Sequence, residues 1–219
     1  MSVVTIERKV LEKNDALAAI NRAAFDRHRL LAVNVVSSPG AGKTTLLEAT
    51  IEHLKDRLRI AVVEGDVQTD LDAQRVARYR VPVVQIVTNG GCHLEAGLVA
   101  QALDRLDLGV LDLLIIENVG NLVCPANYDL GEAMKVVVLS TAEGDDKPLK
   151  YPGMFRRASV LIINKVDLLP YVNADVDMIK RHARQINPAL VVFEMAATTR
   201  TGVAAWCDWL AAEVAARHA

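Results

Sequence analysis

A glycine-rich segment near residue 40 has the residue types and spacing of a phosphate-binding loop. The run Ser37-Ser38-Pro39-Gly40-Ala41-Gly42-Lys43-Thr44-Thr45 follows an aliphatic stretch and precedes a segment with helical periodicity. It fits the Walker A pattern G-x-x-x-x-G-K-[ST], except that Ser37 stands where the pattern has its first glycine. Glycines let backbone N–H groups turn toward phosphate oxygens, and the start of a helix adds a positive dipole end. The segment therefore predicts a nucleotide site formed by Ser38, Gly40, Ala41, Gly42, Lys43, Thr44 and Thr45, with Lys43 on the β- and γ-phosphates and Thr44 on Mg²⁺.

A second motif, Asn164-Lys165-Val166-Asp167, resembles the N-K-x-D guanine-recognition sequence of GTPases. The Asp167 carboxylate can accept hydrogen bonds from the ring N–H and the exocyclic amine of guanine, a pair of donors that adenine lacks. Asn164 is expected to support the loop, and the stem of Lys165 to lie along the base. The stretch from Ala196 to Gly202 loosely resembles the S-A-K-x-G loop of GTPases, so the backbone at Ala197 is expected to contact the guanine oxygen.

Two acidic segments follow aliphatic runs, at the position where α/β proteins bind ligands. They are Glu64-Gly65-Asp66 and Glu117-Asn118-Val119-Gly120. In a GTPase, Glu117 takes the Walker B role and Gly120 directs an N–H toward the γ-phosphate. Asp66 is the better candidate of the first segment for Mg²⁺ or the attacking water, so the predicted magnesium set is Thr44, Asp66 and Glu117, and the predicted catalytic set is Lys43, Asp66 and Glu117. Each acid could instead be an ordinary loop residue or helix cap.

Two thiols and an imidazole form a third set. Cys92 and His93 follow one aliphatic run, and Cys124 follows the next. This donor set suits zinc, nickel or copper better than Mg²⁺ or Ca²⁺. Adjacent Cys and His residues do not easily share one metal with ideal geometry, and three donors fall short of the four that zinc prefers, although a symmetric dimer would supply six. From the residues alone, unliganded loop residues remain an equal alternative, whereas Cys207 is expected to be a core thiol.

Seven short aliphatic runs and intervening helical patterns must position these groups. The runs are mostly continuously apolar, as in strands that are covered on both faces; they span 30–36, 60–63, 83–87, 113–116, 136–139, 160–163 and 190–193. Helical spacing appears in 14–29, 44–58, 71–79, 94–106, 174–185 and 203–216. The alternation predicts an α/β, three-layer P-loop NTPase fold with a mostly parallel sheet of about seven strands. Residues 1–29 are expected to be an N-terminal helical extension, 30–219 the GTPase domain, and 141–153 a long polar loop containing Lys147, a candidate for charge stabilisation.

Composition excludes several classes of protein. The 219 residues carry a formal net charge of −2, so we expect no binding of nucleic acid through bulk charge. Hydrophobic residues make up 52%, too many for a disordered chain, and three cysteines do not make a disulfide framework. No apolar run approaches the roughly 18 residues that cross a bilayer, and residues 1–10 lack a signal-peptide core. We therefore expect a cytoplasmic protein without a membrane partner.

Together these motifs resemble the hydrogenase-maturation nickel-insertion GTPases, the HypB family. The resemblance covers roughly residues 30–210 and is most specific in the stretch Glu117-Asn118-Val119-Gly120-Asn121-Leu122-Val123-Cys124-Pro125. It implies GTP hydrolysis with Mg²⁺, GTP- and metal-linked homodimerisation, and delivery of Ni²⁺ to the hydrogenase large subunit with an accessory nickel-insertion protein. It also implies that Cys92, His93 and Cys124 bind Ni²⁺ or Zn²⁺ at the dimer interface. Some family members carry an N-terminal cysteine motif that binds nickel; residues 1–29 contain no Cys and one His, so we expect no such terminal site in this chain.

Other functions remain open. A urease-type nickel-insertion GTPase would carry Cys-Pro-His in its first metal loop, where this chain has Cys92-His93. A regulatory GTPase that acts only through partners would need neither Cys92 nor Cys124. A structural zinc protein with a residual nucleotide site would hold its metal regardless of nucleotide. An ATP-dependent partitioning protein is disfavoured by the guanine-recognition motif.

Overall fold

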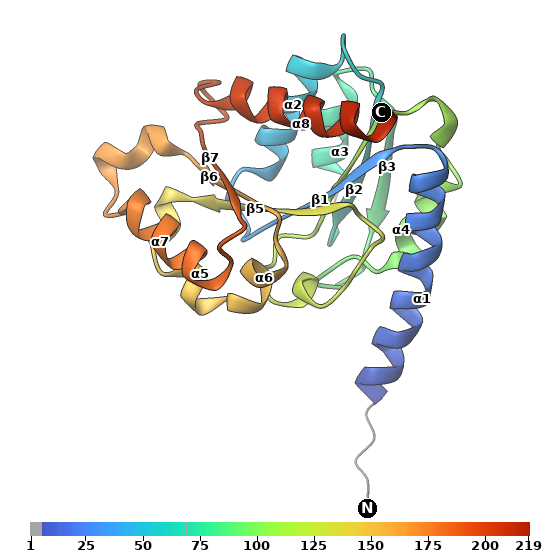
Figure 1. The fold of residues 1–219 in the computed structure, drawn as a ribbon, viewed down its shortest axis with the longest axis horizontal. Coiled ribbons are helices and arrows are strands. Elements are labelled where there is room, and N and C mark those ends of the chain that lie inside the picture. The colour runs from blue at the N-terminus through green and yellow to red at the C-terminus, as the bar shows by residue number, and fades with distance from the viewer. Residues whose placement is uncertain (1–5, 69) are drawn as a thin grey trace, which may run out of the picture.

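The computed structural model describes residues 6–68 and 70–219, in which seven parallel strands form one sheet (Figure 1). The strand order is β3-β2-β4-β1-β5-β6-β7. The strands are β1 Leu31–Ser37, β2 Ile60–Asp66, β3 Val83–Val87, β4 Leu113–Glu117, β5 Met134–Ser140, β6 Val160–Asn164 and β7 Val191–Glu194. All seven predicted strands are confirmed, and the sheet is wholly parallel.

Burial explains why the strands are continuously apolar. Every residue of β1, β4, β5 and β6 is buried, whereas the edge strands β3 and β7 are partly exposed. Several strands extend beyond their aliphatic runs into polar residues, because the sheet's hydrogen bonding continues to Ser37, Asp66, Glu117, Ser140 and Asn164. These polar residues, which include several of the predicted site residues, therefore lie at the carboxyl ends of strands, on rigid backbone.

Helices cover both faces of the sheet (Figure 1). One face packs against α2 Lys43–Leu54, α3 Leu71–Ala77 and α8 Val203–His218 through a core that includes Leu46 and Trp206. The other face packs against α1 Ile6–Arg27 and α4 Ala96–Leu103, and against α6 Pro152–Arg157 and α7 Val176–Ile186. This is the three-layer arrangement expected from the sequence.

Helix α1 lies along α4, and its N-terminal part projects beyond the body of the molecule (Figure 1). Phe25 is buried in the core between α1 and the sheet. The buried side chain of Asn21 donates to Ala96 O and Leu130 O, and Asn14 donates to Asp129 O. These bonds tie α1 to the start of α4 and to the loop before β5.

The segment 141–153, expected to be a polar loop, is largely helical. It contains the 3₁₀ helix η3 Thr141–Glu143 and α5 Lys147–Lys150, and α6 begins at Pro152. Ser140 and Glu143 form a capping box, and proline occupies the first turn of both α5 and α6. Caps and prolines at helix starts stabilise short helices whose length is below what periodicity can reveal.

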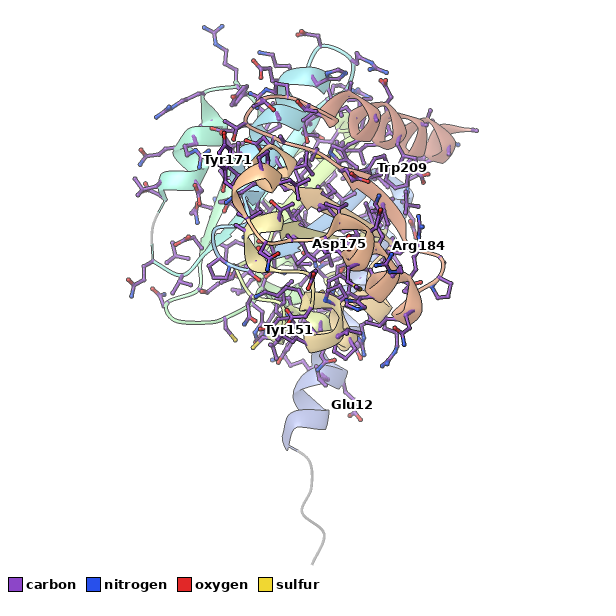
Figure 2. The ribbon with its side chains drawn as sticks, turned by 90° about the vertical axis from the view of Figure 1, so that its left-hand side faces the viewer. Glu12, Tyr151, Tyr171, Asp175, Arg184 and Trp209 are labelled. Carbon is purple, nitrogen blue, oxygen red and sulfur yellow. The ribbon has the colours of Figure 1, made fainter. Side chains whose placement is uncertain are left out.

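Strand β7 is an edge strand of the sheet, and Figure 2 labels Asp175 and Arg184, which lie at the start and in the last turn of α7. Asp175 caps the start of α7 by accepting a hydrogen bond from Met178 N, and Arg184 lies in its last turn. Three further 3₁₀ helices, η1 Leu108–Val110, η2 Cys124–Ala126 and η4 Val166–Tyr171, connect the main elements. Among the residues described, no helix combines the length and apolar character that spanning a membrane requires.

Candidate nucleotide and metal site

The glycine-rich loop has the backbone geometry of a phosphate cradle. Gly40 and Gly42 have φ of +74° and +97°, values that favour glycine, and α2 begins directly afterwards at Lys43. The Lys43 ammonium donates to Ser37 Oγ at 3.1 Å. Ser37, the departure from the Walker pattern, therefore holds the lysine over the loop.

The guanine-recognition motif lies against this loop. Asn164 Nδ2 donates to Ala41 O at 2.9 Å, while Asn164 Oδ1 accepts from Ala197 N at 3.1 Å. Lys165 has a φ of +62° and donates through Nζ to Gly40 O at 2.7 Å. One asparagine thus joins the phosphate loop to the loop after β7.

The base side of the site is open. Asp167 lies exposed in η4, available to a base. The N–H of Ala197 is already donated to Asn164, so in this structure it supports the motif. A Cβ at Gly42 would lie 2.6 Å from Asn164 Nδ2, which explains why the loop needs glycine there.

The carboxylates beside the phosphate loop differ from the predicted set. Thr44 Oγ1 donates to Glu117 Oε1 at 2.9 Å, as expected for a shared magnesium site. The acids grouped with Glu117 are Glu64 and Asp72, which together form the acidic cluster: one oxygen of each lies within 4.8 Å of the others.

Asp66 lies outside this cluster, so the expectation that it joins Thr44 and Glu117 is not met in this structure. Glu64 and Glu117 are register partners in β2 and β4. Asp66 lies two residues, about 6.6 Å, farther along β2. Its carboxylate accepts from Gln68 N at 2.8 Å in a local turn.

The two buried glutamates both have raised pKa values, which favour their protonated forms. Burial, followed by the charge of Glu117, raises the pKa of Glu64 to about 11. Burial also raises the pKa of Glu117, against the lowering effect of the Lys43 charge. One buried oxygen of each, Glu64 Oε2 and Glu117 Oε2, has no hydrogen-bond partner among the described residues. Unpartnered carboxylate oxygens beside a threonine hydroxyl fit the oxygen ligands that Mg²⁺ requires.

A cavity of about 310 Å³ lies over the loop and the acids. Its lining includes Arg75 of α3, which sequence reasoning missed. Arg75 donates to Glu48 Oε2 at 2.6 Å and to Thr45 Oγ1 at 3.2 Å, and pairs with Asp72. The only sequence signal for it is its position one helical turn after Asp72.

Cys92, His93 and Cys124, the thiol–imidazole cluster, come together after β3 and β4. The Sγ atoms of Cys92 and Cys124 are 2.7 Å apart, and Cys92 Sγ is 3.5 Å from His93 Nδ1. One ligand atom of each residue lies within 4.8 Å of the others. The adjacent Cys and His therefore converge, contrary to the geometric objection raised from spacing alone.

Burial and hydrogen bonding shift the pKa values of two members of the thiol–imidazole cluster. Burial lowers the pKa of His93, whose ring packs 3.8 Å from that of Tyr128, so the neutral ligand form is favoured. The hydrogen bond with Cys124 raises the pKa of the Cys92 thiol. Soft sulfur and imidazole donors fit Ni²⁺ or Zn²⁺.

Two other predicted residues have different surroundings. Cys207 is buried in the core, as predicted, and burial raises its pKa to about 12. Lys147 Nζ lies 3.6 Å from Glu143 Oε2 and over the ring of Tyr151. Lys147 is therefore engaged within its own segment.

Comparison with known proteins shows the family of the chain. The family model described as CobW/HypB/UreG, nucleotide-binding domain, matches residues 31–194. The hydrogenase maturation factor HypB of Escherichia coli strain K12 is 51% identical over 208 residues, which covers 95% of this chain and 72% of that protein.

Two solved structures are similar over almost the whole chain. The crystal structure of HypB from Helicobacter pylori in complex with nickel has a TM-score of 0.88 and 42% identity, covering 92% of this chain and 95% of that one. The hydrogenase maturation factor HypB from Archaeoglobus fulgidus has a TM-score of 0.87 and 40% identity, covering 93% and 99%. The chain therefore belongs to the HypB family of hydrogenase maturation factors, within the CobW/HypB/UreG group of nucleotide-binding domains.

Proposed function

We propose that this protein is a GTP-hydrolysing metallochaperone that delivers Ni²⁺ during maturation of [NiFe]-hydrogenase. The observation that carries the proposal is that one short segment, residues 117–124, supplies both Glu117 to the acidic cluster and Cys124 to the thiol–imidazole cluster. A relative named hydrogenase maturation factor and a HypB structure in complex with nickel support the same function.

The nucleotide is assigned to the loop from Ser38 to Thr45, with its base against Lys165 and Asp167 and its γ-phosphate toward Gly120. Thr44, Glu117 and Glu64 are the proposed magnesium ligands, with Asp72 beside them. GTP with Mg²⁺, when bound, supplies a phosphoryl group whose hydrolysis is the energy source. No glutamine follows Gly120 to orient water, so slow intrinsic hydrolysis is expected.

Nickel is the cargo. Cys92, His93 and Cys124 supply three donors, fewer than the four that a closed zinc or square-planar nickel site requires. Two copies would supply six, so we propose a GTP- and metal-linked homodimer with the metal near its axis. The hydrogenase large subunit and an accessory nickel-insertion protein are the proposed partners, with residues 1–29 as a helical extension of the GTPase domain at 30–219.

Equilibrium dialysis of Ni²⁺ tests the proposal. The purified protein is dialysed once with Mg²⁺ and a non-hydrolysable GTP analogue and once with Mg²⁺ and GDP. A change in nickel affinity or stoichiometry between the two states is expected, because linked sites must alter each other's affinity. Coincident binding curves would contradict the proposal and favour a partner-binding GTPase with structural zinc.

Variants of the three cysteines distinguish the loss of a metal ligand from a general loss of folding. Cys92→Ser and Cys124→Ser should each weaken nickel binding, because each removes a soft donor. Cys207→Ser changes a thiol that lies in the core of α8, away from the thiol–imidazole cluster, and should leave nickel binding unchanged. Equal effects at all three cysteines would indicate loss of folding.

A further inference from the structure

The segment 117–121 touches both ligand sites. Glu117 accepts the hydrogen bond of Thr44 from the phosphate loop. Gly120 packs against the same loop, because a Cβ there would lie 3.1 Å from Pro39 Cα. Three residues after Asn121 comes Cys124. If bound nucleotide displaces this segment, the movement therefore occurs three residues from the metal ligand Cys124.

Two asparagines of the segment bind the strand-to-helix connection that carries Cys92 and His93. The buried Asn118 accepts from Leu94 N at 3.1 Å through Oδ1. Asn121 Nδ2 donates to Cys92 O at 3.2 Å. The two bonds flank His93 on either side in the sequence, so residues 92–94 are attached at both ends.

Asn121 also ties the second thiol to the first. Its Oδ1 accepts from Val123 N at 2.8 Å, immediately before Cys124. A single side chain thus bridges the backbone of Cys92 to the residue that precedes Cys124.

Neighbouring contacts restrict how far residues 92–94 and residues 117–118 can move independently of each other. Asn118 Nδ2 donates to Asn34 Oδ1 at 3.2 Å, and Asn34 Nδ2 donates to Glu132 Oε1 at 3.0 Å, so the Asn118 amide is held in one orientation. On the other side, Leu94 packs on Gly65, where a Cβ would lie 2.8 Å from its side-chain carbons. A shift at residues 117–118 must break the bond to Leu94 or move Leu94.

We propose that Asn118 and Asn121 are the positioning residues that transmit nucleotide state to the metal ligands. This rests on the proposed function, since it assigns a route to the linkage between nucleotide and nickel. Asn118 fixes the position of residues 92–94 relative to β4, and Asn121 sets the distance between the thiols of Cys92 and Cys124. Neither side chain needs to touch nucleotide or metal.

The test measures the ratio of nickel dissociation constants in the GDP and GTP-analogue states. Linkages between sites typically amount to roughly 5- to 150-fold in affinity. In Asn118→Ala and Asn121→Ala the ratio should fall toward one, while nickel still binds and its thiolate absorption band persists. Asn187→Ala is the matched control, because Asn187 also makes three side-chain hydrogen bonds, to Phe155 O, Ala158 O and Ala189 N, in another part of the fold.

The outcomes are distinguishable. A wild-type ratio of one would overturn both the proposed linkage and this route. A wild-type ratio that survives in both variants would overturn the route alone. Equal weakening of nickel in both nucleotide states would show a merely structural role and also overturn it. If thermal unfolding shows that Asn118→Ala does not fold, Asn121→Ala decides, because Asn121 is half-exposed and its truncation leaves no buried cavity.

Discussion

At the scale of the residue, the chemistry depends on a few side chains whose partners lie far away in the sequence. Asn164 joins the phosphate loop to the loop after β7. Glu117 accepts a hydrogen bond from Thr44 of the phosphate loop and is the register partner of Glu64 in strand β2. Each makes hydrogen bonds that a substitution would leave unpaired. Base recognition and the buried carboxyl pair are therefore the places where single changes have specific effects.

Asp167→Asn should change the preferred base. In its proposed role, the Asp167 carboxylate would accept from both guanine N–H donors, whereas an amide offers a donor where guanine also has one. Loss of one hydrogen bond to a charged group costs about 1.5 to 3 kcal/mol, so GTP affinity should fall roughly 10- to 100-fold. Xanthosine triphosphate, which has a carbonyl at that position, should bind better than GTP. Titration of both nucleotides checks this, and an unchanged preference for GTP would contradict the role of Asp167.

Glu64→Gln should remove a pH dependence of stability from the metal-free protein. Because the folded pKa of about 11 lies above the ordinary value, stability from Glu64 is present below about pH 4.5 and is lost as pH rises toward 11. The amide stays neutral at every pH, so the stability of the variant relative to wild type should rise between pH 5 and pH 9, by up to about 1.4 kcal/mol per pH unit. Urea unfolding of both proteins at pH 5, 7 and 9, with a chelator that removes Mg²⁺, measures this difference in the free energy of unfolding.

Glu213→Gln on α8 is the control for this series, and should follow wild type at all three pH values. If Glu64→Gln followed wild type as well, the buried carboxyl would not be protonated. With Mg²⁺ and GTP present the comparison should reverse, since the variant lacks a carboxylate for the cation.

At the scale of the element, a buried ion pair holds the loop that carries Cys124. Lys135 of β5 donates to Pro125 O at 2.9 Å and to Tyr128 O at 3.0 Å, and lies 3.3 Å from Glu132 Oε1. The lysine thus satisfies one carbonyl of η2 and one of the loop that follows it. Its removal would leave the Glu132 carboxylate buried without its counter-charge.

Lys135→Met should therefore destabilise the protein by about 3 to 5 kcal/mol. The double variant with Glu132→Gln should recover part of that loss, because no uncompensated charge remains. Urea unfolding of the two single variants and the double variant gives the coupling between the pair. A double variant no more stable than Lys135→Met would show that the lost carbonyl bonds, and not the charge, dominate.

At the scale of the whole molecule, exposed apolar residues follow the carboxyl ends of the strands, as the metal donors do. Val123, which precedes Cys124, is 60% exposed, and Leu71 at the start of α3 is 63% exposed. Both follow carboxyl ends of strands, the edge on which the nucleotide residues lie. Burial of such side chains between two copies would favour the proposed dimer by about 1.5 to 3 kcal/mol each.

Val123→Asp should weaken dimerisation in the presence of Mg²⁺ and a GTP analogue by about tenfold or more. Sedimentation equilibrium with analogue and with GDP measures the monomer–dimer constant. Val110→Asp, at an exposed valine of η1 before β4 and so at the opposite edge of the sheet, should have no such effect. Equal dimerisation of wild type and Val123→Asp would place the interface elsewhere.

The local sequence by itself determined the phosphate loop, the guanine motif, the seven strands and the set of soft metal donors. These features are encoded in contiguous residues, since a glycine turn or an apolar strand depends on its own neighbours. Strand ends and the short helices α5 and α6 were less accessible, because caps and hydrogen-bond ladders extend or begin elements beyond their apolar pattern.

Only the tertiary structure decided which residues meet. The register of β2 with β4 places Glu64 beside Glu117 and leaves Asp66 farther along the strand, a difference of two residues that no local pattern encodes. The approach of α3 brings Arg75 into the nucleotide cavity. The bonds of Asn118 and Asn121 likewise arise from loops of different strands meeting at one edge of the sheet. Sequence specifies the reactive groups through local chemistry, but their pairing depends on non-local packing and register.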